Sequence, residues 1–495
     1  MSDISAKQTS AAAGQGSHAA AGDLPRDPTL LKGKISYAPT EGLSYDPAEA
    51  KYWDESGLAR EVHRVFEVCN GCRMCFKYCD SFPKLFDFID RGHGGDVAQL
   101  AASETREVMD ACFQCKLCEV QCPYTPRDGH EFQLDFPKLV HRFNAQRARR
   151  EGIAFRDRVL GDPDAAGSLA RASLGLANAM NRVSAHRWFL EKALGVHRDK
   201  LLPDFAGSTF EQWAKDEGLV HEKAGGEVVL FQTCYVQNNE PSIGKDTVHV
   251  LQKNQVDVRC ASGLACCGMP AWEKGNLEEL QRRASINLGL LEPFVDRGAK
   301  VLAINPTCSM MLRQEYPHLV APEDRERAVK VAAAVRDPSE FLWGIRKEER
   351  FNEAFADVPE KVAYHAPCHL RAQGVGFKGR DLIRKAGAEV STVMECCGHD
   401  GTYAMKVESF EASVRVGKRA LEGIQEDAEA TTWVTDCPLA ALQFEQHAGK
   451  KPLHPMSLLA RSYRAAESQA AAEGKAEPGL AAKPVQGAKV AQTEK

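Results

Sequence analysis

The pattern of hydrophobic and polar residues divides this chain of 495 residues into a helical first half and a second half in which strands and helices alternate. In the segment DVAQLAASETREVMDAC (96–112), Val97, Leu100, Ala101 and Val108 recur at helical spacing among good helix formers. Residues 131–200 also have a helical pattern. From about residue 226 onward, short runs rich in β-branched residues alternate with helical segments, which is typical of α/β units with parallel strands.

Two helical stretches carry basic residues whose role the pattern leaves open. In 136–152, five basic residues form either a solvated face or a docking surface: Lys138, Arg142, Arg147, Arg149 and Arg150. In SLARASLGLANAMNRVSAHRWFL (168–190), one stripe holds Leu169, Leu176, Met180 and Val183. Such a stripe usually faces a protein core. Because no acidic residue occurs there before Glu191, binding to a membrane surface or a partner helix is the alternative.

The alternating half contains an internal repeat. In the first copy, strands are expected in GEVVLFQTC, VDVRC and KVLAINPTC, with helices in GKDTVHVLQKN and from Asn276 to about Arg297. The second copy follows the same order, with EKVAYHAPC, AEVSTVME and TTWVTDC as strand segments and helices in DLIRKAG and from about 408 to 427. Cys368, Cys396 and Cys437 follow Cys234, Cys266 and Cys308 by 134, 130 and 129 residues. This agreement indicates a duplicated unit.

The predicted organisation is an α+β multidomain protein in which an all-helical domain precedes two repeated α/β cysteine-rich units. Both ends have the composition of disordered tails. The expected divisions are a tail (1–50), a helical domain (51–150), a helical connector (151–225), the first cysteine-rich unit (226–320), a helical linker (321–360), the second cysteine-rich unit (361–465) and a second tail (466–495).

Charge and composition narrow the functional classes. The formal net charge of −5 is small for this length, which argues against a general nucleic-acid binder. No apolar run approaches the length needed to span a bilayer, and the N-terminus lacks the pattern of a signal peptide. Seventeen cysteines without an export signal indicate a reducing compartment in which thiols bind metals. The expected location is therefore the cytoplasm, and peripheral attachment to the inner face of the cytoplasmic membrane is compatible with it.

Eight of the cysteines form two matching runs in the helical domain. CNGCRMCFKYCD and CFQCKLCEVQCP both have the spacing C-x2-C-x2-C-x3-C, which is typical of ferredoxins with two 4Fe-4S clusters. In such runs the fourth cysteine binds the other cluster. We therefore expect two ligand sets, namely Cys69, Cys72, Cys75 and Cys122 for cluster 1, and Cys112, Cys115, Cys118 and Cys79 for cluster 2. Zinc is disfavoured by the third cysteine in each run, and disulfides by the spacing and the expected compartment.

The repeated units each gather four more thiols at the carboxyl ends of predicted strands, the edge at which open α/β sheets bind ligands. The two sets are Cys234, Cys266, Cys267 and Cys308, then Cys368, Cys396, Cys397 and Cys437. Both are candidate metal ligands, and buried structural cysteines are the alternative. Cys260 has no counterpart in the repeat, so it is expected to be structural.

These motifs resemble the iron–sulfur proteins with cysteine-rich CCG domains that are related to heterodisulfide reductase. The resemblance covers about residues 60–465 and is strongest to the C subunits of anaerobic glycerol-3-phosphate dehydrogenases. It is carried by the two ferredoxin-type runs, LLPDFAGSTFEQW, CYVQNNEPSIGKD, CCGMP, PTCSMMLRQEYP, AYHAPCH, ECCGHDGTYAMK and TDCPLAALQ. It implies a non-catalytic electron-transfer subunit with two 4Fe-4S clusters and one or two further clusters at the CCG motifs. The family pattern ends in C-x-x-C, which is incomplete after Cys308 and Cys437.

The resemblance also implies partners. A flavoprotein dehydrogenase would supply electrons, with glycerol 3-phosphate favoured as its substrate, and quinone would accept them. Alternatives are electron donation to a soluble rubrerythrin-type peroxidase, and thiol/disulfide chemistry like that of heterodisulfide reductase, which the incomplete cysteine sets disfavour. His365, His369 and His399 lie beside the candidate cysteines, either as hydrogen-bonding neighbours or as a replacement for a missing thiolate.

Overall fold

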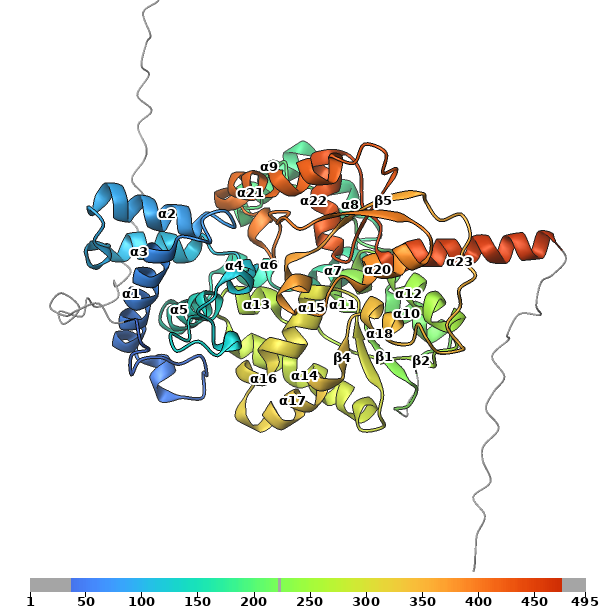
Figure 1. Cartoon of the computed structure of the whole chain (residues 1–495), viewed down its shortest axis with the longest axis horizontal. Coiled ribbons are helices and arrows are strands. Elements are labelled where there is room, and N and C mark those ends of the chain that lie inside the picture. Colours follow the sequence, from blue (N-terminus) through green and yellow to red (C-terminus); the bar gives the residue numbers. More distant parts are fainter. Residues whose placement is uncertain (1–36, 221–223, 474–495) are drawn as a thin grey trace, which may run out of the picture.

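The computed structural model describes residues 37–220 and 224–473, and it has the predicted α+β composition, with many helices and two small parallel sheets. Figure 1 shows the helices of the N-terminal region (blue to teal) beside a larger α/β body (green to red). The described residues contain no helix with the length and hydrophobicity that crossing a membrane requires. Residues 1–36 and 474–495, which make up most of the two predicted tails, lie outside the described residues.

The region from residue 50 to 151 consists of helices and turns. Its elements are η2 (Ala50–Trp53), α1 (Glu55–Cys72), α2 (Ser81–Asp87), the π-helical turn η3 (Phe88–Gly92), η4 (Val97–Gln99), α3 (Ala102–Asp110), α4 (Leu117–Gln121), η5 (Pro126–Asp128) and α5 (Phe136–Glu151). The single helix predicted for 96–112 is wrong, because Leu100 has a non-helical backbone (ψ 127°) and separates η4 from α3. The Glu104 side chain accepts a hydrogen bond from the Ala101 amide (2.7 Å), so a new helix begins there.

Five short helices connect this region to the first sheet. They are α6 (Phe155–Leu160), α7 (Pro163–Ala172), α8 (Leu176–Met180), α9 (Ser184–Leu194) and α10 (Phe210–Asp216). The interpretation of the 169–183 stripe as core-facing is wrong, because the side chains of Leu169, Leu176 and Val183 are exposed. Turns at Leu174 and Gly175, both with positive φ, break the segment into α7 and α8, so one helical face never forms.

The first sheet has four parallel strands in the order β2-β1-β3-β4. The strands are β1 (Val228–Phe231), β2 (Val258–Cys260), β3 (Lys300–Ala303) and β4 (Val335–Arg336). Its helices are α11 (Thr233–Asn238), α12 (Pro241–Lys253), α13 (Met269–Glu273), α14 (Leu277–Val295), α15 (Pro306–Met310), η6 (Met311–Glu315) and α16 (Tyr316–Leu319). Strand β4 lies inside the segment predicted as a helical linker. The sequence did not indicate this strand, because two residues are too short a run to give a strand pattern.

The second sheet repeats this topology with three parallel strands in the order β6-β5-β7. They are β5 (Lys361–His365), β6 (Glu389–Val393) and β7 (Thr432–Thr435). The helices from the linker onward are η7 (Pro322–Asp324), α17 (Arg325–Ala334), α18 (Pro338–Gly344), α19 (Cys368–Ala372), α20 (Lys378–Lys385), η8 (Tyr403–Met405), α21 (Val407–Gln425), α22 (Pro438–Ala448) and α23 (Pro455–Ala472). In each sheet the first strand of the repeat is central, and the next two strands flank it.

Both ends of the described chain pack against the body. The Arg142 guanidinium donates a hydrogen bond to the Gly42 carbonyl (2.6 Å), which holds part of the segment predicted as an N-terminal tail. At the other end, α23 continues past the predicted boundary at residue 466 as far as Ala472. Tyr463 in this helix is buried, and its hydroxyl donates to the Asn352 carbonyl (2.7 Å). The alanine-rich sequence after Tyr463 favours continuation of the helix.

Candidate metal centres

The first group of thiols lies at the end of α1. Cys69 and Cys72 occupy its last turn, Cys75 follows after Arg73, whose left-handed backbone ends the helix, and Cys122 lies directly after α4. All four side chains line one pocket, whose apolar wall includes Val68, Phe82, Phe86 and Leu134. Burial, followed by the other thiols of the group, raises the pKa of Cys69, and the same causes raise that of Cys75 to about 12. The structure therefore brings together the set predicted for cluster 1.

The second group is more deeply buried. Cys79 precedes α2, Cys112 follows α3, and Cys115 and Cys118 lie on either side of the start of α4. Burial and then the neighbouring thiols of this same group raise the pKa of Cys112 and of Cys118. Gln114 and Lys116 both have positive φ, so the backbone between Cys112 and Cys118 turns tightly. The structure thus also brings together the cysteines predicted for cluster 2.

A buried ion pair connects this second group to the first cysteine-rich unit. The Lys116 ammonium lies 2.6 Å from a Glu315 carboxylate oxygen, and both side chains are about 3% exposed or less. Burial alone would raise the pKa of Glu315, but the Lys116 charge outweighs it and the pKa is lowered. Glu315 belongs to η6, so the pair fixes the cysteine loop against the first unit.

The cysteines of the first unit converge at one edge of its sheet, but they lie beyond the strand ends. Cys234 is in α11, Cys266 and Cys267 are in the loop before α13, and Cys308 is in α15. The prediction that Cys234 and Cys308 end strands is wrong, because β1 stops at Phe231 and β3 at Ala303. Cys266 contacts both Cys234 and Cys267, and hydrogen bonds from these two thiols lower the pKa of Cys266.

An ionic shell surrounds Cys266. Its backbone amide donates to an Asp164 carboxylate oxygen on α7 (2.9 Å), and that oxygen also accepts from the Arg283 guanidinium (2.9 Å). Arg283 bonds Asp162 (2.9 Å) and Glu279 (2.6 Å) as well, and its side chain is 3% exposed. The guanidinium thereby holds three carboxylates beside the thiols, and its charge favours a thiolate at Cys266.

The second unit places its thiols against the ferredoxin-type region. Cys368 begins α19, Cys396 and Cys397 follow β6, and Cys437 precedes α22, again beyond the ends of the strands. Cys396 contacts Cys368 and also Cys115 of the second group, and these two thiol contacts, with burial, raise the pKa of Cys396. Cys396 and Tyr403 pack in the same hydrophobic core as the helices of residues 55–143, where the rings of Tyr403 and Phe113 are 4.8 Å apart.

The three candidate histidines have different surroundings. His365 has contacts at both ring nitrogens, with Thr435 Oγ1 (3.1 Å) and the Glu395 carbonyl (3.0 Å). His369 likewise contacts Thr307 Oγ1 (2.9 Å) and the Gln114 carbonyl (3.0 Å). The two nitrogens of His399 are buried and have no hydrogen-bond partner among the described residues.

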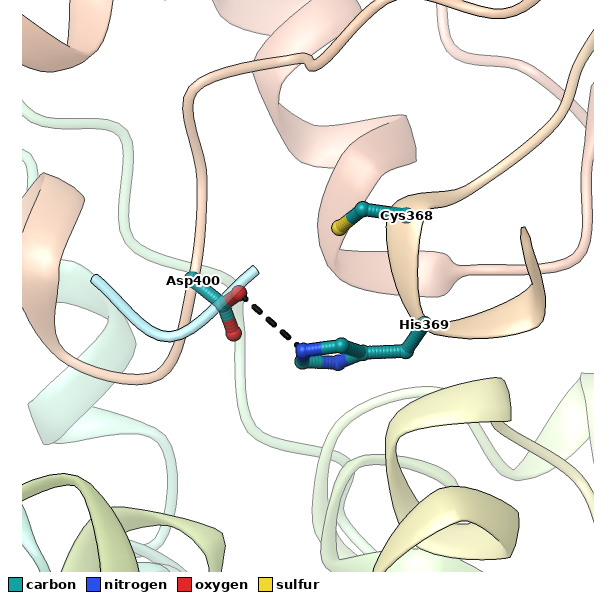
Figure 2. Close-up of side chains that lie close together, drawn as sticks. All are labelled: Cys368, His369 and Asp400. Carbon is teal, nitrogen blue, oxygen red and sulfur yellow. Dashed lines mark ion pairs between the residues drawn. The ribbon is translucent and has the colours of Figure 1, made fainter. Parts of the chain in front are cut away.

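Cys368, His369 and Asp400 form a close group of potential ligand atoms, which Figure 2 shows with the His369 ring pointing toward the Asp400 carboxyl. His369 Nε2 and Asp400 Oδ2 are 3.4 Å apart. Burial, and then the nearby Cys368 and Cys115 thiols, raise the pKa of Asp400. Both ring nitrogens of His369 already contact other parts of the chain, namely Thr307 and Gln114. His369 therefore links the second unit to the first unit and to the loop that contains Gln114.

Two further polar residues approach the thiols of the second unit, and sequence reasoning missed both. Lys200, in the segment after α9, hydrogen-bonds the Gln443 amide oxygen, and Gln443 donates to the Cys397 carbonyl (3.2 Å). Lys200 is 3% exposed, and burial lowers its pKa to about 8. No motif marks Lys200, and although Gln443 ends the TDCPLAALQ motif, nothing in the sequence indicates their contact, because it spans more than 240 positions and depends on tertiary packing.

All seventeen cysteines lie in the described part of the chain and have free thiols. Sixteen belong to the four groups, and Cys260 is buried in β2, where burial raises its pKa to about 12. Groups of soft thiol ligands fit iron–sulfur clusters. Fold and thiols together define an iron–sulfur protein of the electron-transfer class.

Comparison with known proteins agrees with this class. The family model described as "Cysteine-rich domain" (CCG) matches residues 228–313 and 362–445. The chain is 28% identical over 312 residues to the C subunit of anaerobic glycerol-3-phosphate dehydrogenase from Escherichia coli K12, covering 62% of this chain and 77% of that protein. It is 32% identical over 195 residues to lactate utilization protein A of Shouchella clausii, covering 37% and 76% of the two chains. The chain therefore belongs to the family of lactate utilization protein A and contains two CCG domains.

Proposed function

We propose that this protein is a subunit that relays electrons from a flavoprotein dehydrogenase, with glycerol 3-phosphate as the favoured substrate, to quinone. The observation that carries the proposal is a continuous series of three thiol groups, in which Cys75 of the first group acts on Cys118 of the second and Cys115 of the second contacts Cys396 of the second unit. A continuous series is what electron transfer requires, whereas a single catalytic pocket would not need it. The name of the Escherichia coli relative supports the choice of a dehydrogenase partner.

The residues present fit the cofactors that this function needs. The helical region with its two cysteine runs is proposed to be a ferredoxin domain with two 4Fe-4S clusters, held by the two sets of four thiols described above. Each CCG unit offers four more thiols for one further cluster. When bound, the clusters would supply one-electron redox chemistry, and the protein would control their potentials through burial, nearby charge and hydrogen bonds to sulfur.

The flavoprotein is proposed to dock beside the first group. The four cysteines of the first group are only half-buried, whereas Cys79, Cys115 and Cys118 of the second group are buried. Met74 and Phe76, in the loop between Cys72 and Cys79, are exposed (45% and 58%). An exposed apolar loop next to an accessible cluster is a suitable contact for a redox partner.

The acceptor side is proposed to face an anionic membrane surface. Of fifteen exposed large hydrophobic side chains among the described residues, eight lie in α6–α9 and their connections: Phe155, Val159, Leu169, Leu174, Leu176, Val183, Trp188 and Phe189. Between residues 165 and 190 this segment contains three arginines and no acidic residue. Apolar side chains with interspersed basic ones are the combination that binds the interface of anionic bilayers.

Reduction by a purified partner tests the proposed relay. The chain and the flavoprotein dehydrogenase encoded beside it would be purified without oxygen and mixed, and cluster absorbance would be followed. Bleaching by glycerol 3-phosphate that needs both proteins, followed by reoxidation with a soluble quinone, is expected. Bleaching with no quinone reoxidation, but with reoxidation by peroxide plus a rubrerythrin-type protein, would instead establish the soluble alternative.

Sedimentation with vesicles tests the membrane surface separately. Wild-type protein should bind vesicles that contain an anionic phospholipid, and Trp188→Ser/Phe189→Ser should weaken that binding several-fold, because the variant loses buried apolar area in the interface. Val329→Ser is the matched control, since Val329 is also exposed (56%) but lies on α17. Equal binding by all three proteins, or no binding by wild type, would refute this surface.

A further inference from the structure

His399 is an unusual buried residue. Its side chain is 7% exposed, and neither ring nitrogen has a hydrogen-bond partner among the described residues. Leaving one buried polar group without a hydrogen-bond partner destabilises the fold. Such a group in a folded protein therefore needs an explanation, and a bound metal or other ligand is one of the standard explanations.

The two neighbouring histidines have hydrogen-bond partners in the protein and do not need a bound ligand. His365 and His369 are even more deeply buried, but each uses both ring nitrogens in contacts with the protein. Their rings are thus held in place as parts of the scaffold. Of the three histidines beside the second unit's cysteines, His399 alone keeps ring nitrogens available for another atom.

The loop that carries His399 is fixed beside the thiols. Gly398 has φ +77, and its amide lies 3.3 Å from the Cys396 sulfur, while the backbone of His399 hydrogen-bonds the Cys397 sulfur. Ser413 Oγ donates to the Gly398 carbonyl (2.7 Å). A Cβ at position 398 would lie 2.0 Å from the Ser413 carbonyl oxygen, so only glycine allows this path.

Lys200 interacts electrostatically with both Cys397 and His399. The His399 ring and the Cys397 thiol therefore both lie near the same buried ammonium.

The first unit has no histidine at the position that corresponds to His399. Cys266-Cys267-Gly268 is followed by Met269, where Cys396-Cys397-Gly398 is followed by His399. Met269 is buried and packs in an apolar core. The duplicated loop therefore carries an apolar side chain in one copy and an imidazole in the other.

We propose that His399 is a protein ligand of the metal group in the second unit, together with thiols of Cys368, Cys396, Cys397 and Cys437. Neutral imidazole is a common metal ligand, and histidine replaces cysteine as an iron ligand in some iron–sulfur centres. One ring nitrogen would then gain a bond that the protein does not provide. This assignment rests on the proposed function, since it requires that the second unit hold iron.

Pulsed electron paramagnetic resonance of protein containing 15N-labelled histidine tests the proposal. Full-length wild type, His399→Gln, His399→Cys and the control His365→Gln would be purified without oxygen and examined both oxidised and reduced. We expect a strong hyperfine coupling to histidine nitrogen in wild type and in His365→Gln. It should be absent from His399→Gln and from His399→Cys.

The His399→Cys variant distinguishes the loss of one ligand from the loss of the whole metal group. His399→Cys should retain its iron and have a lower midpoint potential, because a thiolate stabilises oxidised iron more than a neutral imidazole does. Iron-containing wild type without histidine coupling in either redox state, or coupling that persists in His399→Gln, would overturn the assignment and leave the relay intact. Wild type that contains no iron–sulfur cluster would overturn the relay itself.

Discussion

The two cysteine-rich units have the same strand order but different surroundings for their thiols. In the first, an ionic shell of Arg283 and Asp164 contacts Cys266. In the second, Cys396 contacts a thiol of the ferredoxin-type region, and the buried Lys200 lies near Cys397. The Cys112–Cys118 loop contacts both units, but it meets the first through the Lys116–Glu315 ion pair and the second through a thiol, whereas α7 reaches Cys266 of the first. Duplication thus preserved the positions of the thiols, while tertiary packing made the two sites chemically different.

Removing the paired cysteines of each unit should give the largest effects. Cys266→Ala/Cys267→Ala and Cys396→Ala/Cys397→Ala should each lose about four irons if each unit holds one cubane cluster. Only the second pair should also change the spectrum of cluster 2, because Cys396 touches Cys115. Iron analysis and electron paramagnetic resonance check this. Identical spectral changes in both variants would remove the distinction between the units.

The buried ion pair to the first unit should contribute strongly to stability. Glu315→Gln leaves the Lys116 ammonium buried, with Glu119 (3.3 Å) as its remaining ion-pair partner among the described residues. We expect the free energy of unfolding to fall by about 3 kcal/mol, as is typical when one partner of a buried pair is removed. Denaturant unfolding measures the loss. Glu292→Gln, which removes a carboxylate from a surface ion pair with Lys330, should cost less than about 1 kcal/mol.

Neutralising Lys200 should affect the second unit alone. Lys200→Met removes a buried positive charge beside Cys397, so the reduced cluster loses a stabilising interaction and its midpoint potential falls. A change of about 60 mV corresponds to one decade in a one-electron equilibrium and is the expected order of magnitude. A redox titration would show the shift. Lys192→Met, at an exposed position on α9, should leave every potential in place.

The smallest effect is expected at the contact between the units. Gln373 Nε2 donates to the Pro306 carbonyl (3.0 Å), Ser309 Oγ (2.9 Å) and the His369 carbonyl (3.0 Å). Gln373→Ala should lower the free energy of unfolding by about 1 kcal/mol and leave the iron content unchanged. A loss of iron from either unit would mean that the contact shapes the sites, contrary to this expectation.

The sequence predicted those features that depend on local periodicity and spacing. The duplicated strand order and the grouping of the sixteen cysteines were predicted from motifs, because short loops set the spacing within each ferredoxin-type run and parallel strands bring the repeated cysteines to one edge of a sheet. The exact strand ends were missed: Cys234 and Cys308 belong to the helices after the strands, where Pro306 at the first turn starts α15. A pattern of apolar residues cannot separate the last strand residues from such a turn.

Contacts between distant segments could not be predicted. Lys200, Asp164 and Glu315 come from other parts of the chain to the surroundings of the thiol groups, and each looks in the sequence like an ordinary surface charge. For the stripe in 168–190 the sequence left a core-facing helix and a membrane or partner surface as alternatives, because a helical stripe has the same pattern whether a core or a partner covers it. Burial is decided by tertiary packing, which a single sequence does not display.

Magnetic interaction between the clusters tests the central claim most directly. In protein purified and fully reduced without oxygen, the cluster of the second unit should show spin–spin coupling to cluster 2, because their thiols at Cys396 and Cys115 are in contact. The cluster of the first unit should show a weaker coupling. Colourless protein, protein that contains only zinc, or four magnetically isolated clusters would contradict the proposed relay.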